Sequence, residues 1–242
     1  MNQAAVKKEE LHAVHLFRKG LATGFPIMLG YLPIAITYGV LARQTGLSFL
    51  ELVMMSGLVY AGASQFMAVN MIAASATVLE ITIATFVLNF RHFVMSLSFM
   101  NRLRHVSNKW KLPLSMGLTD ETFAVASFHP GEAEKKNGTY FYLGIFLIAY
   151  LSWVVGSLLG GLLGDIIPEA LSQSMGIALY AMFIGLLIPS VKKNVKTGLI
   201  AVLAMMINFL CVELGMSSGW AIVVGTVIGG LSGIHLLKEE EA

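Results

Sequence analysis

The sequence predicts an all-α polytopic membrane protein with six full spans and two broken or re-entrant segments. The first reason is composition: 56% of the 242 residues are hydrophobic and only 12% are charged, whereas soluble domains carry about a quarter charged residues. The second reason is that apolar runs of about twenty residues, long enough to cross a bilayer, recur along the chain. The third is that two further apolar runs contain small, polar or acidic residues, which do not suit a helix surrounded by lipid.

The two ends of the chain differ from the rest. Residues 1–19 alternate charged and apolar side chains, which is typical of an amphipathic helix at a membrane surface, and they do not follow the pattern of a cleavable signal peptide. We therefore expect a cytoplasmic N-terminus at 1–19, a single transmembrane domain at 20–237 and a cytoplasmic tail at 238–242.

Six apolar runs are expected to cross the membrane fully. They are residues 20–41, 77–99, 140–163, 175–188, 198–214 and 220–237. Pro26 and Pro33 interrupt the first run, but proline is tolerated in membrane helices, where it often marks a kink. We expect the run 175–188 to end at Pro189.

Glycines recur at a spacing of four residues in three of these runs. The series are Gly20 and Gly24; Gly156, Gly160 and Gly164; and Gly225, Gly229 and Gly233. Residues four apart lie on one face of a helix, and glycine there lets two helix backbones approach closely. The three series therefore predict helix-packing faces rather than ligand sites.

The segment 50–74 is organised around the sequence Tyr60-Ala61-Gly62-Ala63-Ser64-Gln65-Phe66. Small residues allow a ligand or another backbone to approach closely. A glutamine at membrane depth needs a hydrogen-bond partner, because no water is there to solvate it. We therefore expect this stretch to lie inside the protein, with a break in the helix near Gly62.

The run 77–99 carries an amide and two basic side chains just beyond its middle, namely those of Asn89, Arg91 and His92. An arginine at membrane depth costs a few kcal/mol on insertion scales, so such residues usually face a cavity or a partner. Arg91 can instead anchor helix ends by donating to free carbonyl groups, because its guanidinium group carries several donors. Both interpretations stay open at this point.

The segment 112–128 is too short and too polar for an ordinary span. Thr119, Asp120 and Glu121 lie at its centre, whereas a spanning helix needs about twenty mostly apolar residues. A carboxylate at this depth is poorly solvated, so Asp120 is a candidate to take up and release a proton at working pH. Alternatively, Asp120 is an N-cap or a permanent ion-pair partner of Arg91, since Thr119-Asp120-Glu121 resembles a helix start.

The basic residues favour one topology. They cluster at the N-terminus, at 101–111, at Lys135-Lys136, at Lys192–Lys196 and at Lys238. If 50–74 and 112–128 each enter and leave the membrane on the same side, all five clusters are cytoplasmic, as the positive-inside rule requires. If all eight apolar runs cross once, 101–111 lies outside. Eight simple spans, which break the rule at that loop, are the alternative.

These motifs together resemble the AzlC family. The resemblance covers residues 20–237 and is carried by Tyr60–Phe66, by Arg91-His92 after an apolar run, and by Gly117-Leu118-Thr119-Asp120-Glu121-Thr122-Phe123-Ala124. This family forms the large subunit of bacterial branched-chain amino acid exporters. The resemblance implies a transporter domain in the bacterial plasma (inner) membrane, a hydrophobic amino acid as substrate, and a small AzlD-type membrane subunit as partner.

The residues themselves suit a small zwitterion. Paired broken segments are typical of a transporter's substrate site, and the N-terminus of a half-helix can bind a carboxylate. The ammonium group would meet free carbonyls or Asp120, and the apolar side chain would meet Tyr60, Phe66 and neighbouring methionines. The candidate substrate-binding residues are Tyr60, Gly62, Ala63, Ser64, Gln65, Phe66 and Asn89. The candidate coupling or gating residues, with proton coupling in mind, are Asp120, Glu121, Arg91 and His92.

Other classes of function fit the sequence less well. An intramembrane enzyme would have to use Ser64, His92 and the Asp120-Glu121 pair, but adjacent residues point about 100° apart on a helix and make a poor catalytic dyad. The net charge of +2 does not suggest a nucleic-acid partner, and we expect no cofactor or metal ion. No Gly-x-x-x-x-Gly-Lys-Ser/Thr phosphate loop occurs. A channel, or an assembly subunit of a larger transport complex, is the alternative.

Overall fold

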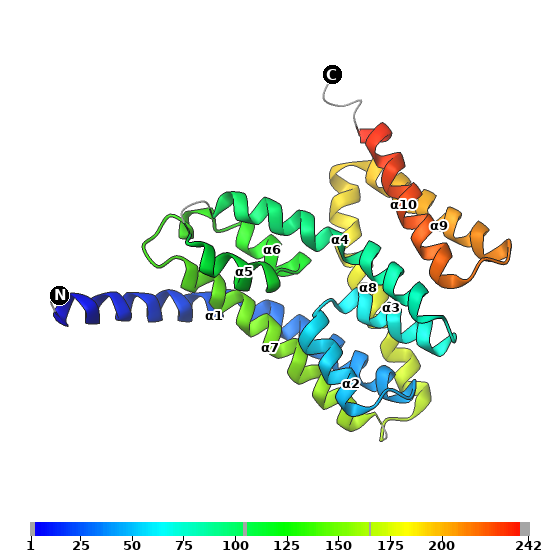
Figure 1. Cartoon of the computed structure of the whole chain (residues 1–242), viewed down its shortest axis with the longest axis horizontal. Coiled ribbons are helices and arrows are strands. Elements are labelled where there is room, and N and C mark those ends of the chain that lie inside the picture. Colours follow the sequence, from blue (N-terminus) through cyan, green and yellow to red (C-terminus); the bar gives the residue numbers. More distant parts are fainter. Residues whose placement is uncertain (1–2, 104–105, 165, 238–242) are drawn as a thin grey trace.

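Helices are the only regular elements in the part of the chain that the computed structural model describes, residues 3–103, 106–164 and 166–237. In chain order (Figure 1) they are α1 (Gln3–Gln44), α2 (Phe49–Met54), a π-helical turn η1 (Met55–Val59), α3 (Gly62–Ala73), α4 (Val78–Arg102), α5 (Asn108–Met116), α6 (Asp120–Ser127), a 3₁₀ turn η2 (Pro130–Glu132), α7 (Thr139–Leu163), α8 (Glu169–Lys193), α9 (Val195–Glu213) and α10 (Ser218–Leu237). Within these ranges, Leu11–Gln44, Val78–Asn101, Thr139–Leu163 and Val195–Glu213 are each long and apolar enough to cross a bilayer. The all-α class is thus confirmed for the described residues.

Helices α1 and α7 lie side by side and run in the same direction (Figure 1). A Cβ atom added at Gly20 would overlap the carbonyl oxygen of Phe141, at the start of α7, and one added at Gly160 would overlap that of Ile36. The two backbones therefore touch from the first turns of α7 to its last. The packing faces predicted at Gly20-Gly24 and along α7 are confirmed.

Prolines inside the long helices do not end them. α1 continues through Pro26 and Pro33, and it joins residues 3–19 to the first span without a helix end. α8 continues through Pro189 to Lys193, so the prediction that this run ends at Pro189 is wrong. Proline removes one helical hydrogen bond, and a membrane helix tolerates this where neighbouring groups satisfy the freed carbonyl.

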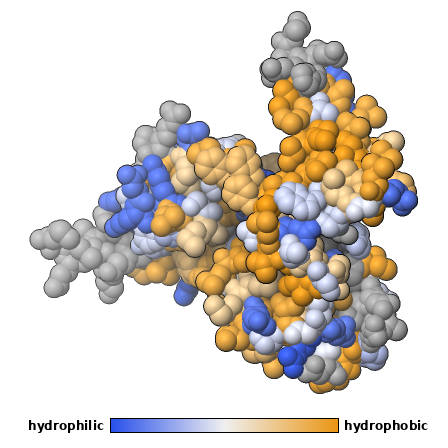
Figure 2. All heavy atoms as spheres, turned by 45° about the vertical axis from the view of Figure 1, so that its right-hand side comes forward, coloured by the Kyte–Doolittle hydropathy of each residue, from blue (hydrophilic) through white to orange (hydrophobic). Residues whose placement is uncertain are grey.

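Helices α9 and α10 form an arm that extends from the rest of the chain (Figure 1). Gly225 and Gly229 lie against Ala204 of α9, and Gly233 lies against Ile200, which confirms the third glycine face and makes the pair antiparallel. α10 also contacts α4. No residue of α9 is buried, and Figure 2 shows hydrophobic side chains over the surface of this arm.

The segment 50–74 is broken where the sequence predicts. α2 passes into η1, Tyr60 and Ala61 leave the helical conformation, and α3 begins at Gly62. We call residues 60–61 the first break.

The two halves of this segment turn back on one another. Leu52 of α2 lies against the last turn of α7, while Gly62 lies against Trp153 nearer its middle. Beyond the first break, the ring of Phe66 packs against that of Tyr38 in α1, with centroids 5.8 Å apart. This part of α1 packs against the last two turns of α7. The chain therefore approaches the middle of the α1–α7 pair and then returns.

The segment 112–128 is also broken and enters from the opposite end. The ring of Trp110 in α5 packs edge-on against that of Tyr140 in the first turn of α7, with centroids 5.8 Å apart. Gly117 lies against Phe146, deeper along α7, and His129, just after α6, is back at the first turn, 5.4 Å from the ring of Phe141. We call residues 117–119 the second break. The two breaks thus point towards each other from opposite ends of the α1–α7 pair.

Candidate functional site

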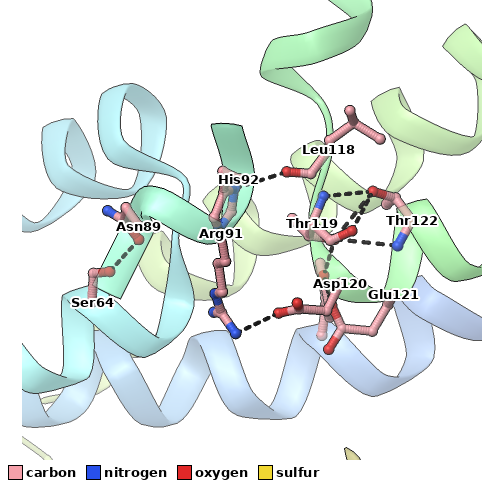
Figure 3. A network of polar contacts seen from close by, with 10 residues as sticks. Ser64, Asn89, Arg91, His92, Leu118, Thr119, Asp120, Glu121 and Thr122 are labelled. Atoms are coloured by element: carbon pink, nitrogen blue, oxygen red, sulfur yellow. Dashed lines mark hydrogen bonds and ion pairs between the residues drawn. The ribbon is translucent and has the colours of Figure 1, made fainter. Parts of the chain in front are cut away.

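Two adjacent cavities lie where the breaks meet. The larger has a volume of about 470 Å³ and the smaller one of about 30 Å³. Tyr60, Ala61 and His92 line both of them, so the cavities share a wall that consists of the first break and one residue of α4. The polar contacts around this wall are drawn in Figure 3.

The larger cavity is mainly apolar. Its lining includes Leu58, Val59, Met116, Leu143, Phe146 and Leu147, together with Tyr150, Pro113 and the polar Asn89. Ligand sites for small molecules are typically concave and mostly apolar, with a few polar groups that orient the ligand. This cavity can therefore hold an aliphatic or aromatic side chain.

The smaller cavity is lined mostly by polar side chains. They are Tyr31 of α1, Arg91 and His92 of α4, Thr119 of the second break, and Asp120 and Glu121 at the start of α6. Gly62 and Ala63, at the start of α3, complete its wall with Trp153.

The start of α3 is uncapped. Ala61 occupies the N-cap position without a side-chain hydrogen bond, and the first helical bond runs from the N–H of Gln65 to the carbonyl of Ala61, at 3.0 Å. The N–H groups of residues 62–64 precede that bond and have no helical acceptor. Tyr60 is only 6% exposed, and its hydroxyl has no hydrogen-bond partner within the described residues. A helix start of this kind attracts an anionic group.

Tyr60 is held in an unusual conformation. Its φ of 45° lies in the left-handed region, which a bulky residue rarely adopts and which costs on the order of 1 kcal/mol or more. Its ring packs edge-on against Tyr150, with centroids 5.0 Å apart, and the hydroxyl of Tyr150 donates to the carbonyl of Gly57 at 2.9 Å. Strain of this kind persists where surrounding contacts enforce it, and it clusters at functional sites.

Gln65 lies behind the first break rather than on a cavity wall. Its amide nitrogen donates to the hydroxyl of Ser56 at 2.9 Å, and its amide oxygen accepts from the indole N–H of Trp153 at 2.9 Å. Ser56 in turn donates to Ser157 of α7 at 2.7 Å. These buried bonds fasten the first break to α7, so Gln65 positions the break.

Helix α4 links the two breaks (Figure 3). Asn89 accepts a hydrogen bond from the hydroxyl of Ser64 in α3. Two residues on, Arg91 forms an ion pair with Asp120 in α6, with a nitrogen–oxygen distance of 2.7 Å. The Nδ1 atom of His92 lies 3.1 Å from the carbonyl oxygen of Leu118. Of the two open interpretations of Arg91, the structure thus supports the one in which this residue faces a partner, and the partner is the carboxylate of Asp120.

The second break ends at a capped helix. The side chain of Thr119 accepts from the N–H of Thr122, and that of Thr122 accepts from the N–H of Thr119 at 2.7 Å. Thr119 is therefore the N-cap, and Asp120 is the first helical residue. The interpretation of Asp120 as an N-cap is wrong because the hydroxyl of Thr119 takes that position, while its interpretation as an ion-pair partner of Arg91 agrees with the structure.

Glu121 is held by a residue of α1. The hydroxyl of Tyr31 donates to a carboxylate oxygen of Glu121 at 2.5 Å and lies 2.6 Å from the hydroxyl of Thr119. Within the described residues, Glu121 forms no ion pair, since Arg91 is engaged with Asp120.

Most of the residues predicted from the sequence line one of the two cavities. They are Tyr60, Gly62, Ala63, Asn89, Arg91, His92, Asp120 and Glu121. Ser64, Gln65 and Phe66 lie behind the first break and line neither cavity. Sequence reasoning missed Tyr31, Trp153, Thr119 and Tyr150, because aromatic residues and threonine are ordinary in membrane spans and helix starts. Among the described residues, no group of three His, Cys, Asp or Glu side chains could hold a metal ion.

Comparison with known proteins points to one family. The model of the AzlC protein family matches residues 26–167, a stretch that contains both breaks and ends before α8. An uncharacterized membrane protein of Helicobacter pylori (strain J99) is 34% identical over 188 residues, which cover 75% of this chain and 80% of that protein. The inner membrane protein YgaZ of Escherichia coli is 29% identical over 222 residues, covering 90% and 89% of the two chains. The branched-chain amino acid transport protein AzlC of Bacillus subtilis is 28% identical over 141 residues, covering 58% and 55%. No solved structure matches this chain.

Proposed function

Because this chain belongs to the AzlC family, we propose that it is a membrane transporter that exports branched-chain or other hydrophobic amino acids. The observation that carries the proposal is the junction of the two breaks, where an uncapped helix start and several polar groups adjoin an apolar cavity of about 470 Å³. An amino acid needs both kinds of surface, since its charged groups must be satisfied before they leave water.

The uncapped start of α3 suits the carboxylate of the substrate. The N–H groups of residues 62–64 and the hydroxyl of Tyr60 are the donors, and the positive end of the helix dipole adds to them. The apolar side chain would extend into the larger cavity, between Met116 and Leu143. One methylene group changes binding by only about 1–3 kcal/mol, so such a cavity cannot discriminate sharply among leucine, isoleucine, valine and methionine.

In the membrane, we place the six full spans across the bilayer and the two broken segments as re-entrant hairpins from opposite sides. Contacts with α1 and α7 support this arrangement, because Leu52 and Phe66 lie at one end of the α1–α7 pair and Trp110 and His129 lie at the other. Both termini then lie in the cytoplasm, and so do residues 106–107 and the loop at 128–138.

Cysteine labelling in intact cells tests this topology. With Cys211 replaced by alanine, Ser107→Cys and Glu134→Cys are expected to be protected from a membrane-impermeant thiol reagent. Met216→Cys, in the loop between α9 and α10, is expected to react and serves as the positive control. Labelling at Ser107→Cys together with protection at Glu134→Cys would instead establish eight simple crossings.

We further propose that export is coupled to the proton gradient through the ion pair between Arg91 and Asp120. This pair joins α4 to α6, and the contact between His92 and Leu118 joins the same two elements. Protonation of Asp120 would free Arg91 and loosen the second break, which opens the site. A small AzlD-type subunit would complete the transporter, and the exposed apolar surface of α9 is available to such a subunit or to lipid.

Transport into inverted membrane vesicles that contain the small subunit tests the function. Wild-type protein is expected to accumulate labelled leucine when the vesicle interior is acidic. Asp120→Asn is expected to keep leucine exchange but to lose at least about tenfold in pH-driven accumulation, because an amide cannot carry a proton. Glu134→Gln, an exposed carboxylate in a loop, is the matched control and should behave as wild type. Absence of leucine transport by the wild type would refute the transporter, whereas pH-driven accumulation at the wild-type rate in Asp120→Asn would remove only Asp120 from the mechanism.

A further inference from the structure

The smaller cavity carries an unbalanced negative charge. Two carboxylates line it, those of Asp120 and Glu121, against one guanidinium group, that of Arg91. The ion pair at 2.7 Å assigns Arg91 to Asp120. Within the described residues, Glu121 has the neutral hydroxyl of Tyr31 as its partner, and a carboxylate without a counter-ion at membrane depth is costly. A cation that entered this cavity would neutralise the excess negative charge.

His92, which lines both cavities, offers a hydrogen-bond acceptor. The carbonyl of Leu118 can only accept a hydrogen bond, so the Nδ1 atom of His92, 3.1 Å away, carries the ring proton. In the neutral imidazole the other nitrogen, Nε2, then holds a free lone pair. That atom is buried and has no hydrogen-bond partner within the described residues, and the hydroxyl of Tyr60 is in the same situation.

The size of the cavity limits the group that it can hold. A volume of about 30 Å³ has room for a small group, since about 10–15 Å³ measured in this way is enough to hold one water molecule. An ammonium group fits such a space and the excess negative charge favours it, whereas a whole amino acid does not fit. The larger cavity, beyond the shared wall of Tyr60, Ala61 and His92, has room for the rest of the molecule.

We propose that the smaller cavity is the binding site for the α-ammonium group of the substrate, with Glu121 as its counter-ion and the Nε2 atom of His92 as a second acceptor. The hydroxyl of Tyr60 accepts the third N–H bond, so that the three donors of the ammonium group meet three acceptors. This inference rests on the proposed function. It names the site by which the protein would discriminate amino acids from the corresponding 2-oxo acids, which lack the amine.

Binding to the purified full chain in lipid nanodiscs tests the proposal, with L-leucine and its 2-oxo acid, 4-methyl-2-oxopentanoate, as the two ligands. Wild-type protein is expected to bind leucine more tightly than the oxo acid. Glu121→Gln and His92→Leu are each expected to weaken leucine binding by about 10–100-fold and to leave the oxo acid within about threefold, because the oxo acid has no ammonium group to lose. His92→Gln should recover part of the affinity, since its amide oxygen reaches towards the position of Nε2.

His129→Leu is the matched control. His129 also places Nδ1 against a backbone carbonyl, that of Val125 at 2.9 Å, but it lines neither cavity. Leucine binding should be unchanged in this variant, and melting temperatures should show that all variants are folded. Folded Glu121→Gln protein that binds leucine as wild type overturns the ammonium site, and so does an equal loss for both ligands. If the wild type binds neither ligand, the proposed function fails as well.

Discussion

Gly62→Leu is expected to abolish transport while the protein still inserts into the membrane. A Cβ atom at residue 62 would lie 2.6 Å from the ring of Trp153, too close for any real contact. Trp153 cannot retreat easily, because it is buried and its indole N–H is bonded to Gln65 at 2.9 Å. The start of α3 must move instead, which displaces the N–H groups of residues 62–64 and fills the smaller cavity. Leucine favours the bilayer, so insertion should remain near normal.

The measurement is leucine uptake into inverted vesicles, normalised to the amount of protein in the membrane, and a loss of at least about 100-fold is expected, equivalent to roughly 2.7 kcal/mol or more. Gly30→Leu is the matched control, since nothing lies within 4 Å of a Cβ atom at that position in α1. Full transport activity in Gly62→Leu would show that the start of α3 does not contact substrate.

Gly160→Val is expected to prevent stable folding. Its Cβ atom would overlap the carbonyl oxygen of Ile36, and a backbone atom inside α1 cannot rotate away as a side chain can. The two helices must separate along their contact, which removes close packing that drives helix association in membranes. Overpacking of this kind typically costs about 1–3 kcal/mol, and more where backbone must move.

Yield of monodisperse protein after detergent extraction, together with its melting temperature, measures this effect. Gly230→Val in α10 is the control, because a Cβ atom there meets nothing within 4 Å and the change in volume is the same. A melting temperature for Gly160→Val equal to that of wild type would mean that α1 and α7 do not pack through their backbones.

The sequence predicts the positions of both breaks but not the roles of the residues around them. Ala61, Gly62 and Ala63 signal the first break because they are small where a lipid-facing helix would be large. Gln65 stands in the same motif and looks like a ligand for substrate, yet its partner is Trp153, 88 residues away in the chain. No local pattern reveals a bond over that distance, so positioning and binding residues look alike in the sequence.

A similar limit applies at the second break. Thr119, Asp120 and Glu121 resemble a helix start, and α6 does begin there. Which of the three is the cap, which is paired and which is left without a cation depends on Arg91 in α4 and on Tyr31 in α1. Tyr31 lies between two prolines that the sequence marks more strongly, and only the packing of α1 on α6 brings its hydroxyl to the site.

The common direction of α1 and α7 imposes a parity condition on the chain. Two spans that cross a membrane in the same direction must be separated by an odd number of crossings. Three segments lie between them: α2 to α3, α4, and α5 to α6. Because α4 is a span, the two broken segments must either both cross the membrane or both return to the side from which they entered. If only one of them crossed, α7 would be antiparallel to α1. A change that converted one hairpin into a true span would therefore have to convert the other at the same time.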